Sequence, residues 1–275
     1  MYTSFANYLI ALRGYSPRTA HGYIKDIEHF RKWLYEHKLH ANLFRVTRDD
    51  LDDYVTDRCA HGIAPATTNH ELSSISAYYR FLRREGQISD NPTRYESRRK
   101  PEIKAPNTIP MEDIKQAYAH AGGTAKIVLG LLITTGMRIC ELMSLQWRDI
   151  NFRTGSILLN GKGSKQRVVY TSSEVLALLE QASDRWSLPD YVITIPERRV
   201  RQIVHDCLRP YSQARQLSPH AIRHTFATQM ALAGVNTSTL SVMLGHQSLE
   251  TTQRYIDLAQ SDTERAFRQF NPLNI

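Results

Sequence analysis

The chain has 275 residues, enough for one large or two modest globular domains with buried cores. Its formal net charge of +8 and pI near 9.4 favour a polyanionic partner. The start of the chain has no basic region followed by an apolar run, and no stretch of about 18 consecutive apolar residues occurs, so secretion and membrane insertion are disfavoured. The cysteines are too few and too scattered for a disulfide framework or a zinc site, and we expect reduced core residues in a cytoplasmic protein: Cys59, Cys140 and Cys207.

Residues 3–86 carry helical patterns throughout and predict a four-helix domain. A short first helix is expected around Phe5–Leu12. Ser16-Pro17 opens the second helix, because serine caps free backbone N–H groups and proline at the first helical position gives up no hydrogen bond. Thr47 is a capping candidate for the third helix. Apolar residues recur at helical spacing in the second and fourth helices: Ile24, Ile27, Phe30 and Leu34, then Leu72, Ile75, Tyr79 and Leu82.

Residues 91–110 have the composition of a linker. They combine four prolines with several arginines and lysines, and they show little periodicity. This predicts an extended, positively charged connector between two domains. A connector of that charge gains phosphate contacts if it runs along a nucleic-acid backbone.

The pattern changes after Met111. A helix is predicted over 111–121, and KIVLGLLITTG is apolar on nearly all sides, which indicates a buried helix that ends at Gly136. Arg138 begins the next turn, with Glu141 three residues later. A buried arginine without a partner is costly, so Arg138 is expected to pair with Glu141 or with a ligand phosphate.

Short strands are predicted by DINFRTGSILLNGKGSKQRVVYT, with a hairpin tip at residues 161–163. The glycines on either side of Lys162 let the backbone turn tightly and leave the ammonium group mobile. Lys165 and Arg167 are alternative candidates for a functional cation, and spacing alone does not choose among the three. Capped or basic amphipathic helices are then predicted over 172–187 and 197–216.

The stretch from Ser218 to Tyr255 carries the groups suited to chemistry. Ser218 and the proline after it open another helix, and His220 and Arg223 share one face of its first turn, beside the positive end of the helix dipole. An anion fits at that position. A second helix is expected to end at Gly245, which presents His246, and Tyr255 follows nine residues later.

Two histidines, an arginine and a tyrosine at these intervals suggest phosphoryl transfer to a side-chain oxygen. Arginine has a fixed fork of donors suited to phosphate oxygens. A tyrosine hydroxyl titrates near pH 10, so as a nucleophile it needs a proton acceptor and a well-held electrophile. A lone HxxR pair is usually a surface or capping feature, and it is the combination that favours catalysis.

These blocks resemble those of the tyrosine recombinases, the phage-integrase and Xer-type family. HAIRHTFAT, LGH and TxxxY are similar to the family's catalytic box, and TTGMRICELMSL at 134–145 is similar to its first arginine motif. NGKGSKQRVV at 160–169 resembles the lysine hairpin, and the family pattern matches Lys162. All four blocks occur in the family's order. The catalytic residues implied by the resemblance are Arg138, Lys162, His220, Arg223, His246 and Tyr255.

The resemblance implies a mainly α fold with a small antiparallel β-sheet in the C-terminal domain, arranged as a two-domain, C-shaped DNA clamp. The expected parts are a helical, SAM-like core-binding domain over 1–88, a basic linker over 89–107, and a catalytic domain with a C-terminal tail over 108–275. The residues expected to bind DNA are Arg80, Arg83, Arg84, Arg98, Arg99, Lys100, Arg199 and Arg201.

The implied function is site-specific DNA recombination, in which strands are cut and rejoined through a covalent 3′-phosphotyrosyl intermediate. Tyr255 attacks, two arginines hold the scissile phosphate, His220 accepts the tyrosine proton and Lys162 protonates the departing 5′ oxygen. His246 hydrogen-bonds a phosphate oxygen, and Glu141 supports Arg138 or His220. Neither a metal nor another cofactor is expected, because two guanidinium groups supply the positive charge.

The implied partners are double-stranded DNA target sites and three further copies of the chain in a tetrameric synapse, with a second recombinase or a DNA-bending factor as further candidates and no membrane. Two alternatives stay open: a type IB topoisomerase-like or telomere-resolving enzyme, and a catalytically silent DNA-binding protein on the same scaffold. The chain starts almost directly with the core-binding helices, which favours a Xer-like, invertase-like or simple integrase role. Residues around Phe267–Phe270 are expected to dock on their own core or on the next protomer.

Overall fold

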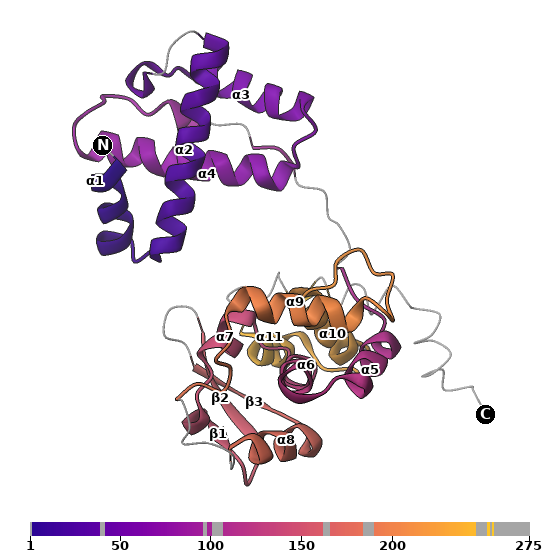
Figure 1. The fold of residues 1–275 in the computed structure, drawn as a ribbon. Coiled ribbons are helices and arrows are strands. Elements are labelled where there is room, and N and C mark those ends of the chain that lie inside the picture. The colour runs from indigo at the N-terminus through magenta and orange to yellow at the C-terminus, as the bar shows by residue number, and fades with distance from the viewer. Residues whose placement is uncertain are drawn as a thin grey trace, which may run out of the picture. The chain divides into compact units, whose positions relative to one another are not determined.

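The computed structural model describes residues 2–38, 42–95, 98–100, 107–161, 166–183, 190–245, 252, 253 and 255. They belong to two compact units, Met1–Ile103 and Lys104–Ile275 (Figure 1). The first unit is helical, and the second combines helices with one small sheet. In the described ranges no helix has the length and apolar character needed to cross a membrane.

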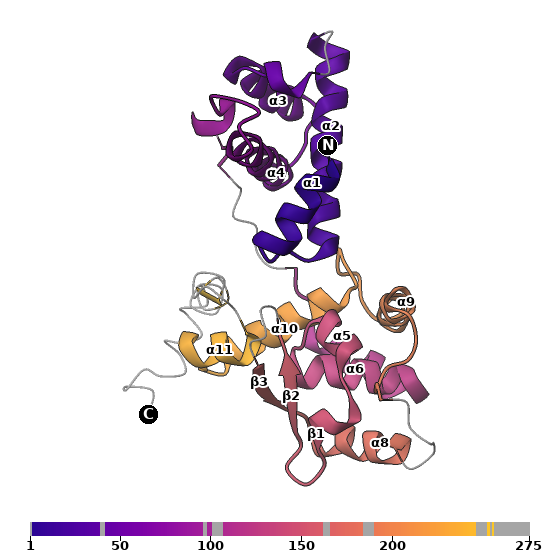
Figure 2. The same cartoon turned by 90° about the vertical axis from the view of Figure 1, so that its left-hand side faces the viewer.

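The described part of the first unit holds four α-helices, which confirms the sequence prediction (Figures 1 and 2). They are α1 (Tyr2–Asn7), α2 (Pro17–Lys38), α3 (Arg48–Ala60) and α4 (Pro65–Arg84), with a π-helical turn at Tyr8–Leu12 and 3-10 turns at Leu43–Arg45 and Pro92–Tyr95. Thr47 caps α3 as predicted: its hydroxyl accepts from the Asp50 amide at 3.3 Å, and the Asp50 carboxylate accepts from the Thr47 amide at 2.8 Å.

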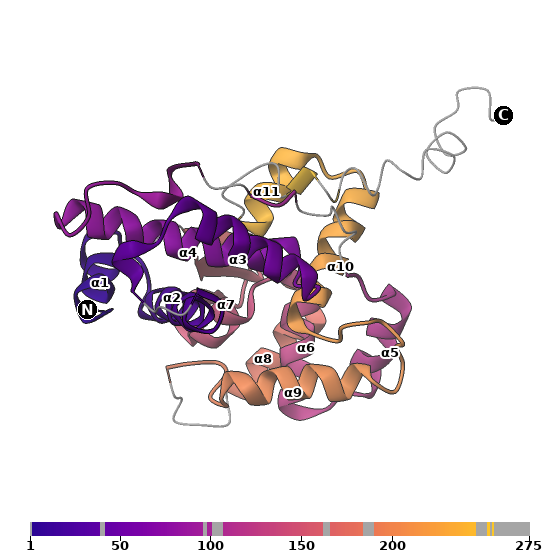
Figure 3. The same cartoon turned by 90° about the horizontal axis from the view of Figure 1, so that it is seen from above.

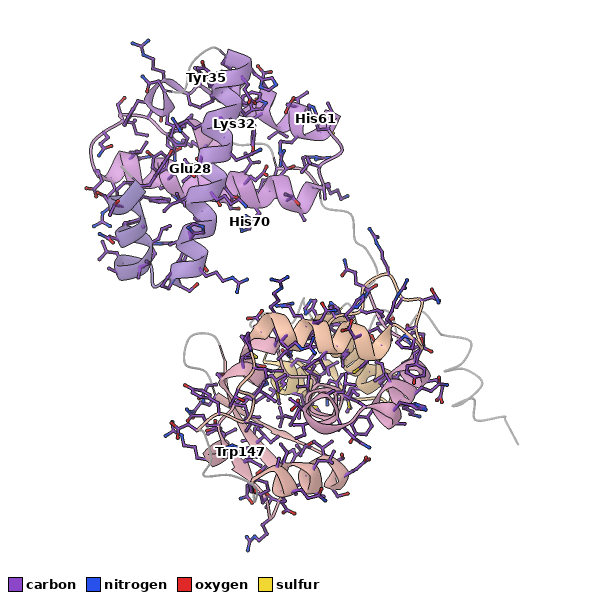
Figure 4. The ribbon with its side chains drawn as sticks, viewed as in Figure 1. Glu28, Lys32, Tyr35, His61, His70 and Trp147 are labelled. Atoms are coloured by element: carbon purple, nitrogen blue, oxygen red, sulfur yellow. The ribbon has the colours of Figure 1, made fainter. Side chains whose placement is uncertain are left out.

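The core of the first unit lies where α2 packs against α4. Six of the eight predicted apolar positions are buried there: Ile27, Phe30, Leu34, Ile75, Tyr79 and Leu82. Leu72 is also buried, and Ile24 is partly buried against this core. Beside them the Tyr54 hydroxyl donates to Glu71 at 3.0 Å, and Arg58 pairs with the same carboxylate at 2.5 Å. The other side of α2 is exposed and carries charged and polar groups, among them Glu28, Lys32 and Tyr35 (Figure 4).

The second unit is built from seven α-helices and three strands in its described residues. The helices are α5 (Met111–His120), α6 (Gly123–Thr135), α7 (Ile139–Ser144), α8 (Ser173–Ser183), α9 (Glu197–Leu208), α10 (Pro219–Leu232) and α11 (Thr237–Leu244), with a 3-10 turn at Trp147–Asp149. The apolar α6 contacts α5, α8, α9 and α10, which lie around it in Figures 1 and 3. It is the buried helix that the sequence predicts.

The sheet consists of β1 (Ile150–Asn151), β2 (Ser156–Asn160) and β3 (Gln166–Tyr170), antiparallel and in the order β1-β2-β3. Its register pairs Ile157 with Val169 and Leu159 with Arg167. Residues directly opposite each other point to the same face, so these four share one face of the sheet. Ile157, Leu159 and Val169 are buried core residues, and Arg167 therefore points inward among them.

Gly136 ends α6 in the left-handed conformation, with φ of +60° and its N–H bonded to the Leu132 carbonyl at 3.1 Å. A Cβ at this position would overlap the ring of Phe226 on α10. Both the backbone angle and the close approach of α10 therefore require glycine here. The chain then turns into Arg138, the residue before α7.

The expectation of core cysteines is wrong for two of the three. Cys59 and Cys140 are exposed and Cys207 is half-buried, all as free thiols. For Cys59 the reason is its helical position: it lies five residues after the buried Tyr54, which places it about 140° round α3 from the core face.

Candidate active site

Helix α10 presents the functional residues of the HAIRH motif from its first turns. The Ser218 hydroxyl accepts from the Ala221 amide at 3.2 Å, and Pro219 occupies the first helical position, so the predicted opening is confirmed. His220, Arg223 and a second histidine, His224, follow at spacings of three and four residues. They therefore project from one side of the helix.

Arg223 is almost completely buried, with only 3% of its surface exposed. Its Nη1 donates to the Gly136 carbonyl at 2.6 Å and its Nη2 to the Leu244 carbonyl at 2.6 Å. Burial and then the neighbouring charge of Arg138 lower the pKa of Arg223 to about 10. The guanidinium therefore remains cationic at neutral pH. Its present acceptors are neutral carbonyls, and an anion would accept its hydrogen bonds more strongly.

Arg138 and Glu141 form the pair that the sequence predicts. The Glu141 carboxylate accepts from the Arg138 backbone amide at 2.7 Å and from its Nη1 at 3.0 Å. The Arg138 Nη2 also donates to the Gly245 carbonyl at 2.9 Å. The Arg138 side chain keeps 35% of its surface exposed, so it is open to a ligand from solvent.

Arg167 on β3 completes this cluster. Its Nη1 and Nη2 donate to the two Glu141 oxygens at 2.6 and 2.8 Å, and its Nε donates to the Met243 carbonyl at 2.8 Å. From the sequence, Arg167 was expected only as an alternative to Lys162. The signal that identifies it is strand periodicity, because Arg167 stands two residues from the buried Val169 on an inward position where an arginine needs an acidic partner.

The environment of Glu141 keeps it ionised. Burial raises its pKa, but the hydrogen bonds from Arg167 and from the Arg138 amide, together with both positive charges, outweigh that effect and leave the pKa below its usual value. One carboxylate thus faces three guanidinium groups, those of Arg138, Arg167 and Arg223. The imbalance leaves the site positively charged and suited to an anion such as a phosphodiester.

The last turn of α11 binds all three arginines through its backbone. The carbonyls of Met243, Leu244 and Gly245 accept from Arg167, Arg223 and Arg138 respectively. The carbonyls at a helix C-terminus have no partners within the helix and carry its negative end, which explains why cations gather there. Gly245 ends α11 in the left-handed conformation, as predicted.

Tyr255 lies in a small apolar cluster formed by α10 and α11, with Phe226, Ala227, Leu240 and Leu244. Its ring is buried, and its hydroxyl lies 2.6 Å from the Nδ1 of His224. The His224 ring in turn contacts the His220 ring, with 4.2 Å between centroids. His224 was not among the expected catalytic residues, although it stands in the HAIRHTFAT motif four residues after His220.

Tyr255, His224 and His220 form a row of contacting side chains, and His220 is at the end near the arginines. Burial and then the positive charges of Arg223 and Arg138 lower its pKa, which leaves a neutral imidazole at pH 7. The structure therefore brings five of the expected residues to one place: Arg138, Glu141, His220, Arg223 and Tyr255. The other two, Lys162 and His246, lie outside the described residues.

The residues expected to bind DNA are distributed over both units. Those on α4, Arg98, Lys100 and the pair on α9 are exposed, and Arg201 pairs with Glu197 at 2.6 Å. Arg99 is half-buried and donates to the Ile63 carbonyl at 2.6 Å, while its amide donates to Asn69 at 3.0 Å. Within the described part of the chain, no group of three or more histidine, cysteine or acidic side chains is placed as a metal site requires.

Comparison with protein families gives two matches that together span most of the chain. Residues 108–262 match the model described as the phage integrase family. Residues 3–86 match the model described as the phage integrase N-terminal SAM-like domain.

Curated relatives match over almost the whole length. The tyrosine recombinase XerC of Pediococcus pentosaceus is 29% identical, covering 98% of this chain and 96% of the relative. The tyrosine recombinase XerC of Bacillus pumilus is 28% identical, covering 98% of this chain and 95% of the relative.

Solved structures share the fold at lower sequence identity. A XerH site-specific recombinase bound to a palindromic difH substrate, in a post-cleavage complex, has a TM-score of 0.75 and 17% identity, covering 93% of this chain and 81% of that one. A lambda integrase tetramer bound to a Holliday junction has a TM-score of 0.72 and 17% identity, covering 94% and 77%. The predicted fold class, mainly helical with a small antiparallel sheet in the C-terminal domain, is confirmed.

Proposed function

The chain belongs to the phage integrase family and is a tyrosine-type site-specific recombinase, and we propose that it breaks and rejoins DNA strands through a covalent 3′-phosphotyrosyl bond to Tyr255. The observation that carries this proposal is the position of the Tyr255 hydroxyl. It lies against the same face of α10 that holds the buried Arg223. A nucleophile and a cationic phosphate site are thus presented by one helix.

The arginines bind the scissile phosphate. Arg138 and Arg223 exchange their carbonyl partners for the non-bridging oxygens, which are charged and therefore stronger acceptors. As negative charge builds on the pentacoordinate phosphorus, the two guanidinium groups already bound to its oxygens stabilise that charge. Barriers of this kind must fall by roughly 15–20 kcal/mol, and positioning with charge stabilisation is the main source of that reduction.

The remaining expected residues complete the proton and phosphate contacts. The neutral imidazole of His220 is the expected acceptor of the Tyr255 proton. His246 hydrogen-bonds a phosphate oxygen, and Lys162 donates a proton to the departing 5′ oxygen. Glu141 acts through Arg138 and Arg167, which it holds by direct hydrogen bonds.

We propose double-stranded DNA target sites as the substrate and a tetramer on DNA as the working form, in the cytoplasm, with the two units closing on the duplex as a clamp. The boundaries of the two domains and of the linker, 1–88, 89–107 and 108–275, are part of this proposal. Exposed arginines on α4 and α9 and the basic residues 98–100 contact phosphates. A second recombinase or a DNA-bending factor fits the same scheme.

A suicide substrate tests the covalent step. The protein is incubated with a pool of nicked duplexes of varied sequence, and denaturing gels reveal protein bound covalently to DNA. We expect an adduct with the wild type and none with Tyr255→Phe, and peptide mapping should place the nucleotide on Tyr255. The matched control is Tyr170→Phe, because Tyr170 is an exposed tyrosine of the same unit and should leave the adduct unchanged.

The outcome that contradicts the proposal is an adduct that persists in Tyr255→Phe. Adduct formation that requires Tyr170 would contradict it equally. Salt-sensitive binding of the pool with no adduct for any protein would favour a silent DNA-binding role instead.

A further inference from the structure

The contact between His224 and Tyr255 has no role in the assignments above. The expected acceptor of the tyrosine proton is His220, yet the ring atom next to the hydroxyl oxygen is Nδ1 of His224, at 2.6 Å. This is a short hydrogen bond made to the reacting atom itself. Any group that removes a proton from a nucleophile must lie within this range of it.

We propose that His224 is a catalytic residue: it holds the Tyr255 hydroxyl and accepts its proton as the oxygen attacks phosphorus. The proposal rests on the function proposed above and deepens it. It assigns His220 to the phosphate and His224 to the nucleophile, so the two neighbouring histidines have separate tasks.

The geometry separates those tasks. His220 and His224 stand one turn apart on α10, with ring centroids 4.2 Å apart and planes inclined at 69°. Burial lowers the pKa of His220, and the charges of Arg223 and Arg138 lower it further, so His220 lies within electrostatic reach of both guanidinium groups. His224 lies next in the row and contacts the tyrosine. The row thus leads from the phosphate site to the nucleophile.

The surroundings of Tyr255 favour a defined position for its hydroxyl. The ring is buried against Phe226, Ala227, Leu240 and Leu244, so the direction of its C–O bond is fixed by packing. A hydroxyl held in this way is best served by a proton acceptor that is itself held in a fixed position. An imidazole anchored on the rigid α10 meets that requirement.

The proton balance of the step is complete. The step requires His224 to start neutral with its hydrogen on Nε2. His224 then accepts the phenolic proton on Nδ1, while the tyrosine oxygen bonds to phosphorus and the bond from phosphorus to the 5′ oxygen breaks. The departing 5′ oxygen takes a proton from Lys162. In rejoining, the 5′ hydroxyl gives its proton back to that amine and attacks phosphorus, and the leaving phenolate recovers its proton from His224.

The test uses His224→Asn, because the asparagine oxygen lies close to the place of Nδ1 and can accept the hydrogen bond without taking the proton. We expect normal DNA binding and a loss of adduct formation of about 10²-fold or more, the range typical of a positioned general base. The matched control is His29→Asn. In the first unit the Nδ1 of His29 makes a comparable contact with the Tyr54 hydroxyl at 3.0 Å, and its loss should leave the adduct rate unchanged.

A second substrate tests whether His224 acts on the attacking tyrosine or on the departing 5′ oxygen. In a 5′-bridging phosphorothiolate the departing atom is sulfur, which leaves without a proton. We expect His224→Asn to stay slow on it, whereas Lys162→Ala, slow on ordinary DNA, should regain its rate. Added imidazole should restore part of the rate in His224→Gly, which a purely structural role would not allow.

Three results would overturn the proposal. An unchanged rate in His224→Asn would make the contact structural, and a faster rate would make it a restraint on the tyrosine. Recovery of His224→Asn on the phosphorothiolate would move the histidine to the leaving group. Failure of the proposed function is a separate outcome, since the wild type would then form no adduct on either substrate.

Discussion

Replacing Arg167 by methionine tests whether the buried cluster depends on this residue. The change removes hydrogen bonds of 2.6 and 2.8 Å to Glu141 and one of 2.8 Å to the Met243 carbonyl. Glu141 has 2% of its side-chain surface exposed and Arg167 has 7%, so water does not replace the lost partner. Breaking a buried pair from one side costs about 3–5 kcal/mol. Because Glu141 keeps Arg138, we expect about 3 kcal/mol.

The matched control is Arg201→Met. Arg201 meets Glu197 at the same 2.6 Å, but their side chains are 49% and 34% exposed. An exposed pair of this kind contributes at most about 1 kcal/mol, since solvent screens it. The two variants therefore remove ion pairs of equal length and different burial.

Urea unfolding measures the loss of unfolding free energy in both variants. Each variant is made in a Trp33→Phe background, so that the remaining tryptophans, Trp147 and Trp186, report the second unit alone. The reasoning is refuted if Arg167→Met unfolds within 1 kcal/mol of Arg201→Met. It is also refuted if the double variant Glu141→Gln/Arg167→Met loses the full sum of the two single losses, because partners in one cluster must show coupling.

Three further predictions use the same assay. Gly136→Ala should lower the free energy of unfolding by about 2 kcal/mol or more, because φ is positive and the Cβ meets Phe226. Gly234→Ala, also at positive φ but in open space, should lower it by about 1 kcal/mol. Equal losses in the two variants would contradict the packing argument. Asn236→Ala should cost about 1 kcal/mol by removing the cap of α11, and no loss would exclude that cap. Because the pKa of Glu141 is lowered in the folded state, its ionised form stabilises the fold at pH values above the pKa of the unfolded carboxyl. The difference in unfolding free energy between wild type and Glu141→Gln should therefore stay constant above about pH 5 and become smaller as the pH falls. A difference that stays constant down to about pH 3 would refute this prediction.

Much of the helical architecture follows from local signals in the sequence. Ser218-Pro219 opens α10, Thr47 caps α3, and glycines at 136 and 245 end α6 and α11, because caps and left-handed C-termini depend on the residues at those positions. The pairing of Arg138 with Glu141 is local as well, since the two stand three residues apart. The cost of an unpaired buried arginine predicted either this partner or a ligand phosphate, and in the structure Glu141 is the more buried member of the pair.

The rest of the site depends on contacts between distant parts of the chain. Arg167 meets Glu141 from 26 residues away, and the Tyr255 hydroxyl meets His224 from 31 residues away. Spacing within a motif carries no information about such pairs, because they are set by how β3, α10 and α11 pack. Arg167 and His224 both stand inside recognised sequence motifs. The motifs alone did not indicate which residues these two side chains contact.

Helix α11 contacts both the phosphate-binding arginines and the tyrosine nucleophile. Its carbonyls hold the guanidinium groups that are to receive the phosphate, while Leu240 and Leu244 on the same helix support the ring of Tyr255. If a phosphate replaces these carbonyls as proposed, the last turn of α11 loses hydrogen-bond partners while it still packs beside Tyr255. The same short helix therefore connects the phosphate site to the packing of the tyrosine ring.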